Sequence, residues 1–388
     1  MGPAVDVISV DLLLWSFYFL CFKDVQNRFV YVVKRGSTNG DDEQFSDAAK
    51  HKTDAQAAPS RIIEEQYPAK LSERLNWIGT LLVSIRMKHW KVGDASHDRR
   101  QPPELAFRSR SAFMNLAIRS FVRGYLILDF TRAYISYDSY FTDANVSISS
   151  PLPSRTLDFV PPQVFRSAIL AAQAWAAISQ LMYLPCLLPL GLNALGWLPD
   201  EWSPHHWAPL FGPISVIAQR GVRGFWGEYW HQAMRIMSAG PGYAVVDVLG
   251  IAPGSFLRYA IVTSVAFFLS GVVHMGLVPP EPLHAKESVN MIRLKVGTFF
   301  WLQPTAILAE VAVGKLMLAV CPPSVRQTSL PMVGRKVVNV AFFLAWATFC
   351  LPLLGDMARQ IGYWHVWPVP LSLWRGIRAE GWSTWIER

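Results

Sequence analysis

Residues 268–274 read Phe-Leu-Ser-Gly-Val-Val-His, and they lie inside Tyr259–Pro280, a run with no Asp, Glu, Lys or Arg. About 20 apolar residues suffice to cross a bilayer as a helix. An ionisable side chain at that depth is costly and is by default a candidate functional residue. A second unusual stretch, RGFWGEYWHQ at residues 223–232, concentrates aromatic and polar side chains and contains His231. We therefore take His274 and His231 as the candidate functional histidines.

Composition places the chain in the membrane. Of its 388 residues, 52% are hydrophobic and 16% are charged, against about 25% charged in a typical soluble domain. The net charge of +8 is expected of loops that follow the positive-inside rule. No basic run interleaved with exposed aromatics points to nucleic acid. We expect an all-α, polytopic integral membrane protein whose helices enclose an intramembrane catalytic cavity.

Six apolar runs are clear candidate spans, and up to nine exist when doubtful runs are included. With six spans, the loops rich in Lys and Arg fall on the cytosolic side of the membrane, but the basic C-terminus falls on the lumenal side. We therefore favour about seven spans, with the seventh at Ile361–Trp374. Leu75–Ile85 is too short to span and is expected to be an interfacial or re-entrant helix. Pro241–Gly254, which Pro and Gly bound, is expected to be re-entrant. The six clear runs are Ala4–Phe22, Ser111–Thr131, Ser167–Pro199, Tyr259–Pro280, Val296–Val320 and Val337–Gly355.

The chain is expected to divide at residue 110. Residues 1–110 hold the first span and a mixed-charge cytosolic loop, in which 36–59 has the composition of a disordered segment. Residues 111–388 form the membrane-embedded domain. The connection Arg132–Arg166 is poor in Lys and Arg and contains the sequon Asn145-Val146-Ser147, so it is expected on the lumenal side, with Asn145 a possible glycosylation site.

A helix over Val222–Ala239 would place Glu228, His231, Gln232 and Arg235 on one face, three and four residues apart. Its aromatic side chains would occupy the neighbouring face and point inward. Such a helix would lie at the membrane surface or cap a cavity. The alternative is an interfacial amphipathic helix whose histidine has no role.

In the stretch at residues 268–274, Ser270 and Gly271 lie one turn before His274. Ser270 is expected to orient the imidazole by a hydrogen bond, which a buried histidine needs. Gly271 removes side-chain bulk beside it, where a substrate could pass a general base. The alternative is a structural histidine between helices. No third ligand stands at metal-binding spacing near the remaining histidines, so we expect no metal site.

These motifs resemble the wax-synthase-like branch of the membrane-bound O-acyltransferases, which includes fungal secondary-metabolite acetyltransferases. The pattern is Phe225-Trp226-Gly227-x-x-Trp230-His231-Gln232 followed by Ser270-Gly271-x-x-His274. Glu228 stands where a basic residue is expected. Weaker similar features are Arg86-x-x-x-Trp90 and Gly124–Asp129.

The resemblance implies acyl transfer from acyl-CoA to an alcohol, with His274 as general base and no acyl-enzyme. It implies that His231 orients the donor or stabilises the oxyanion, and that Trp226, Trp230 and Gln232 shape the site. The expected partners are acetyl-CoA as co-substrate, a lipophilic terpenoid or meroterpenoid alcohol and the lipid bilayer. No permanently bound cofactor is expected, and the membrane is expected to be the endoplasmic reticulum.

Two alternatives stay open at this point. A long-chain wax ester synthase would use the same chemistry with fatty acyl-CoA and a fatty alcohol. A transporter or structural membrane protein would release no CoA from any donor; the absence of a visible inverted repeat counts against it.

Overall fold

The computed structural model describes residues 13, 16, 19, 25–35, 61–83, 90–92, 110–143, 145–154, 159–198, 210–231, 235–320 and 329–384. The chain forms two compact units, one of Phe19–Pro103 and one of Met1–Tyr18 with Glu104–Arg388. The segment 36–59 and most of the expected span Ala4–Phe22 lie outside the described residues. The expected division at residue 110 stays a prediction.

The smaller unit contains a β-sheet, which the all-α prediction missed. Its three strands are antiparallel in the order β2-β1-β3, and Tyr31 pairs with both Glu65 and Trp90. Buried aromatic side chains form its core: the rings of Trp77 and Trp90 lie edge to face, 4.6 Å apart. The β-branched and aromatic run in β1 is typical of strands. The elements are α2 (Val25–Arg28), β1 (Phe29–Arg35), β2 (Arg61–Glu65), α3 (Leu71–Val83) and β3 (Trp90–Val92).

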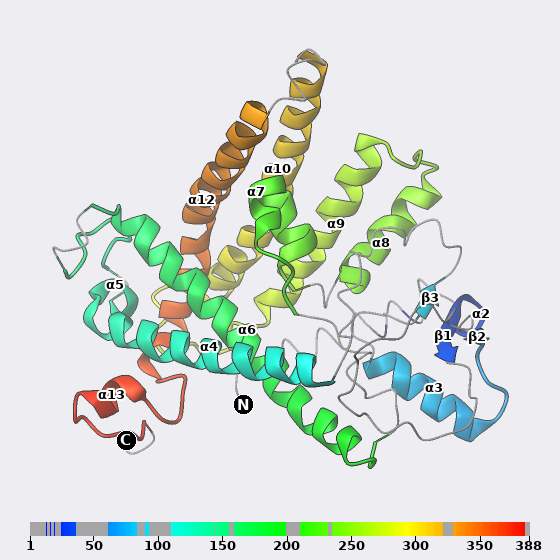
Figure 1. Cartoon of the computed structure of the whole chain (residues 1–388). Helices are drawn as coiled ribbons and strands as arrows, with labels where there is room; N and C mark the ends of the chain where they lie inside the picture. The colour runs from blue at the N-terminus through cyan, green and yellow to red at the C-terminus, as the bar shows by residue number, and fades with distance from the viewer. Residues whose placement is uncertain are drawn as a thin grey trace. The chain divides into compact units, whose positions relative to one another are not determined.

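The larger unit is helical (Figure 1). The long helices α6, α9, α10 and α12 carry most of its apolar sequence. Neighbouring pairs include α4 with α6, α8 with α9, α9 with α10, and α10 with α12. The elements are α4 (Arg110–Tyr137), α5 (Ser139–Thr142), α6 (Pro162–Ala194), α7 (Ser215–Gly224), η5 (Phe225–Tyr229), α8 (Arg235–Val248), α9 (Phe256–Met275), α10 (Val289–Val320), α12 (Ser329–Gln360), η6 (Tyr363–His365) and α13 (Leu373–Ile377).

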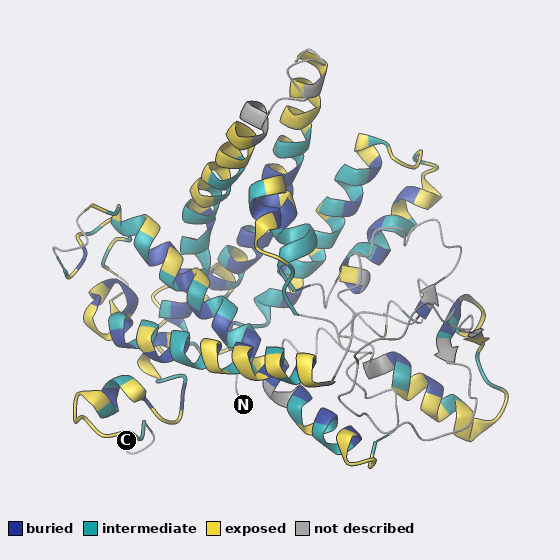
Figure 2. Ribbon diagram, in the orientation of Figure 1, coloured by how far each residue is buried: buried dark blue, intermediate teal, exposed yellow. Residues whose placement is uncertain are grey.

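Four helices among the described residues are long and apolar enough to cross a membrane: Pro162–Ala194, Phe256–Met275, Val289–Met317 and Val333–Gln360. They coincide with four of the expected spans. Many of their apolar side chains face outward, and Figure 2 shows exposed positions along α10 and α12. Outward apolar side chains on helices of this length are what a lipid environment requires. The fold is that of a polytopic, mostly helical integral membrane protein.

The expected seventh span at Ile361–Trp374 is wrong. α12 ends at Gln360, and Gly362 follows in the left-handed conformation with φ 77°. The segment after it contains Pro368 and Pro370, which cannot donate backbone hydrogen bonds to a helix. Up to residue 384, where the described part ends, this segment forms η6, α13 and an isolated bridge between Leu371 and Ser383.

This C-terminal segment instead packs on α4. Asp129 of α4 is fully buried, and its carboxylate accepts hydrogen bonds from the Trp367 indole at 3.0 Å and the Trp374 backbone N–H at 3.1 Å. α4 covers the expected span Ser111–Thr131, yet its charged residues Arg119, Arg123 and Asp129 leave it outside the four apolar helices. Both arginines are exposed. The carboxylate in this helix thus has a structural partner.

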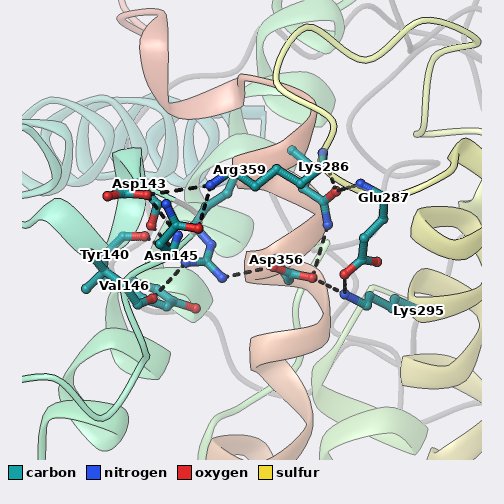
Figure 3. A network of polar contacts seen from close by, with 10 residues as sticks. Tyr140, Asp143, Asn145, Val146, Lys286, Glu287, Lys295, Asp356 and Arg359 are labelled. Carbon is teal, nitrogen blue, oxygen red and sulfur yellow. Dashed lines mark hydrogen bonds and ion pairs between the residues drawn. The ribbon is translucent and has the colours of Figure 1, made fainter.

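A polar network joins the end of α12 to two connections between helices (Figure 3). The Lys295 ammonium bridges Asp356 of α12 and Glu287, at 2.5 and 2.6 Å. Arg359 donates to the backbone carbonyls of Tyr140, Asp143 and Val146. The segment that contains the sequon is therefore held to the C-terminal end of α12.

Candidate active site

The first motif, the stretch RGFWGEYWHQ at residues 223–232, does not form the single helix expected over Val222–Ala239. α7 ends at Gly224, and η5 is a turn of π-helix that closes with a hydrogen bond from the Trp230 N–H to the Phe225 carbonyl, 2.7 Å. Trp230 is extended, with φ −67° and ψ 152°, and the next helix begins only at Arg235. π-helical turns inside helices are frequent at functional sites.

This break changes the polar face that the sequence predicted. Glu228 belongs to η5 and Arg235 to α8, whereas His231 follows the extended Trp230 and lies in neither helix, so the three do not share one helix face. The Glu228 carboxylate forms an ion pair with Arg220. Arg235 is exposed and donates to the Gly227 carbonyl at 3.2 Å. Gln232 lies outside the described residues, and its expected role stays a prediction.

A carboxylate from α10 holds the start of the motif. Gly221 has φ 56°, which interrupts α7 and leaves the N–H groups that follow without helical acceptors. The two carboxylate oxygens of Glu310 accept from the N–H groups of Val222 and Arg223, each at 2.8 Å. A Cβ on Gly221 would lie 2.0 Å from Glu310 Oε1, so this approach requires glycine. Glu310, which interrupted an apolar run in the sequence, therefore serves as a cap for the motif.

Replacing Glu310 by alanine is expected to destabilise the protein by on the order of 1–3 kcal/mol, because two N–H groups lose their acceptor. Glu310→Gln keeps one acceptor oxygen and should lose less. The measurement is the thermal unfolding midpoint in detergent. Glu281→Ala, at an exposed loop position, is the control and should not shift the midpoint. Equal midpoints for Glu310→Ala and Glu281→Ala would contradict the assignment.

The second motif ends α9 with a specific hydrogen bond. Nδ1 of His274 lies 2.7 Å from the backbone carbonyl oxygen of Ser270. A carbonyl oxygen only accepts, so Nδ1 carries the proton and Nε2 of the neutral ring has a free lone pair. The backbone carbonyl of Ser270 thus orients the imidazole, and the expected role of the serine side chain stays a prediction. The arrangement presents Nε2 as a base.

Gly271 allows α9 and α10 to approach closely. A Cβ at this position would lie 2.5 Å from the indole nitrogen of Trp301 and 3.2 Å from the carbonyl oxygen of Gly297. The Trp301 indole donates to the Phe268 carbonyl at 3.2 Å. The space left by the missing side chain is occupied by Trp301 of α10. The expected passage of substrate at Gly271 stays a prediction.

Aromatic rings connect the two histidines. The His274 ring lies on Phe300 of α10, with centroids 4.1 Å apart. Phe300 contacts Trp226 at 6.3 Å, Trp226 contacts Trp230 at 6.1 Å, and Trp230 contacts His231 at 5.5 Å. Trp226 of the first motif therefore packs against Phe300 of α10, whereas all four aromatic residues of that motif are only partly buried. Three rings lie between the histidines in this series.

One residue of this cluster was missed by the sequence analysis. Gln303 of α10 is 1% exposed, and its Oε1 accepts from the indole N–H groups of Trp226 and Trp346, both at 3.0 Å. A buried amide needs hydrogen-bond partners, so a glutamine inside an apolar run could have marked this position as a candidate site residue from the sequence. Neither the motif spacing nor the family pattern includes it.

Other features of the described residues do not add to this site. They contain no group of three or more His, Cys, Asp or Glu side chains that could hold a metal ion. An apolar groove of about 390 Å³ lies between α7 and α12, and neither histidine lines it. Its lining residues are Ala218, Lys336, Val337, Val340, Ala341 and Leu344.

Comparison with known proteins connects both motifs to one family. The model of the membrane bound O-acyl transferase family matches residues 207–287, which contain α7, η5, α8 and α9 with both histidines. Over these residues the chain is similar to the membrane bound O-acyl transferase family. No solved structure matches this chain.

Several curated proteins to which this chain is similar are fungal proteins named acetyltransferases. Acetyltransferase ple2 of Rhodocybe pseudopiperita is 32% identical over 207 residues, which cover 53% of this chain and 49% of the relative. Acetyltransferase eriL of Hericium erinaceus is 25% identical over 336 residues, 84% of this chain and 78% of the relative. Acetyltransferase pyr8 of Aspergillus fumigatus is 28% identical over 179 residues. The matched part of the chain thus spans 49% of the length of ple2 and 78% of the length of eriL.

Proposed function

We propose that this protein is an acetyl-CoA-dependent O-acetyltransferase that acylates a hydroxyl of a lipophilic terpenoid or meroterpenoid. The observation that carries the proposal is His274, with Nδ1 tied to the Ser270 carbonyl and Nε2 available as a base, inside an apolar helix of the family segment. General bases of this kind act on a proton within hydrogen-bond reach. The names of the relatives support acetyl as the transferred group.

In the proposed reaction, the alcohol oxygen attacks the thioester carbonyl of acetyl-CoA while its proton passes to Nε2 of His274. The tetrahedral intermediate collapses, the C–S bond breaks, and the CoA sulfur leaves and takes the proton from His274. The products are the acetate ester and CoA, and no acyl-enzyme forms. His231 is proposed to orient the donor or stabilise the oxyanion. Trp226, Trp230 and the apolar helices around them exclude water, which would otherwise hydrolyse the thioester.

The direct test is to incubate membranes that contain the protein with labelled acetyl-CoA and a panel of terpenoid alcohols. Ester formation with CoA release supports the proposal. A preference for fatty acyl-CoA and fatty alcohols, with acetyl-CoA a poor donor, would favour a wax ester synthase instead. Release of no CoA from any donor by folded protein would favour a transporter or structural role and would reject the enzyme proposal.

The protein is proposed to reside in the endoplasmic reticulum with the Asn145 segment on the lumenal side. Asn145 is exposed, and its side-chain oxygen accepts from Lys286 Nζ at 2.7 Å in the network of Figure 3. Attachment of a glycan would take the place of this surface contact.

Expression in a eukaryotic membrane is expected to give a protein whose gel mobility increases after glycosidase treatment. Asn145→Gln should remove this response, because it removes the acceptor amide of the sequon. Asn339→Gln, a substitution outside any Asn-x-Ser/Thr sequence, should leave it unchanged. A wild-type protein without a glycosidase-sensitive shift would contradict the lumenal assignment.

A further inference from the structure

We propose that Gln303 is a positioning residue of the acyl-transfer site, whose side-chain amide fixes the Trp226 indole against the ring that supports His274. The proposal rests on the proposed function for its catalytic consequence. Its structural part concerns a hydrogen-bonded joint between α10, η5 and α12, and that part can be measured without any activity.

The Gln303 amide uses all of its hydrogen-bonding capacity inside the protein. Oε1 accepts two indole N–H groups, from Trp226 of η5 and Trp346 of α12, at 3.0 Å each. Nε2 donates to the Phe299 carbonyl at 2.7 Å and points to the Cys350 sulfur at 3.6 Å. An amide oxygen has two lone pairs and an amide nitrogen has two hydrogens. The orientation of the amide is therefore determined by its four partners.

Only an amide side chain of this length meets these demands. A carboxylate would provide acceptor oxygens but no donor for the Phe299 carbonyl, and a methionine of similar length provides neither. A buried network that is fully satisfied rigidifies its surroundings, whereas a partly satisfied one is costly. Gln303 thus specifies one position for both indoles.

The position of Trp226 matters because of what it contacts. Its ring lies between η5 and the helices α9 and α10, against Phe267 at 5.3 Å, Phe299 at 6.3 Å and Phe300 at 6.3 Å. Phe300 in turn lies on the His274 ring. The amide of Gln303 thereby acts on His274 through two aromatic rings. Displacement of about 1 Å at a reacting group can cost about 10²-fold in rate.

The activity-independent test uses protein labelled with ¹⁵N in its indole nitrogens. Trp226→Phe and Trp346→Phe, which keep an aromatic ring but no N–H, assign the two resonances. Gln303→Met should shift both to higher field, because both lose their acceptor. Gln163→Met is the matched control: this glutamine donates to the Thr348 carbonyl of α12 at 3.1 Å and should move neither. Unchanged indole resonances in Gln303→Met would overturn the proposal.

The kinetic test uses the same variants. Gln303→Met and Trp226→Phe are each expected to lower kcat about tenfold, with the KM for acetyl-CoA within about twofold of the wild type, because positioning affects the reacting geometry. The double variant should be no slower than the worse single variant, since both substitutions remove the same hydrogen bond. Gln163→Met should keep wild-type kinetics. Additive losses in the double variant would overturn the positioning role.

Two outcomes separate this proposal from the proposed function. If wild-type protein transfers no acyl group but Gln303→Met shifts both indole resonances, the proposed function is rejected and the hydrogen bonds of Gln303 to both indoles are supported. If Gln303→Met does not fold, Trp346→Phe supplies the test: with one donor removed, Oε1 accepts only from Trp226, and the Trp226 resonance should move to lower field. No movement of that resonance would contradict the shared acceptor.

Discussion

His274→Ala is expected to lower the turnover of acetyl transfer by about 10²–10⁴-fold, the range that a general base contributes. The physical reason is the loss of the Nε2 lone pair that the Ser270 contact leaves available. His274→Gln has a similar volume but no base at neutral pH, and it should lose activity to the same degree. The measurement is kcat with saturating labelled acetyl-CoA in detergent-solubilised protein of verified folding.

His284→Ala is the matched control for this experiment. His284 lies in the connection after α9, where its ring stacks on His365 at 4.1 Å, and it belongs to neither motif. It should keep near wild-type turnover. A His274→Gln protein that retains more than half of the wild-type kcat would show that another group takes the proton.

Arg166→Met is expected to destabilise the protein by about 3–5 kcal/mol, because it leaves a buried carboxylate without its partner. Arg166 and Asp138 have side chains only 1% exposed and bind each other through two hydrogen bonds of 2.8 Å. The same guanidinium donates to the carbonyls of Ile148 and Ser150 at 2.8 and 2.7 Å. Loss of this residue therefore also frees the connection that contains the sequon.

The stability measurement is a reversible denaturant or SDS titration of the solubilised protein. Glu380→Ala removes an exposed ion pair with Arg378 and should cost no more than about 1 kcal/mol. The double variant Asp138→Asn with Arg166→Met should recover part of the loss, because no unpaired charge remains buried. If Arg166→Met costs no more than Glu380→Ala, the ion pair does not support the fold.

The membrane character and four helices of membrane length could be predicted from the sequence, because the mean hydropathy of a continuous run does not depend on tertiary contacts. The same local reasoning located His274, since a histidine in an uncharged run of that length is visible without a structure. The first motif was found by its composition, and its Trp226 packs against α9 and α10.

Local reasoning failed where long-range contacts compete with helix propensity. The helix expected through His231 is interrupted at Trp230, where a π-helical turn closes, and the apolar segment after α12 folds onto Asp129 instead of crossing the membrane. The sheet of the smaller unit was missed because its strands are short and far apart in the chain. β1 pairs with β2, about 30 residues later, and with β3, about 60 residues later.

The sequence by itself determined that this is a membrane protein with a histidine inside one apolar helix and another beside an aromatic cluster. Only the tertiary structure decided how these are held: Glu310 caps a segment 88 residues away in sequence, and Gln303 binds an indole 77 residues away. A buried polar side chain must find partners somewhere. Which partners it finds depends on which helices pack together, and that information is not local to any stretch of the chain.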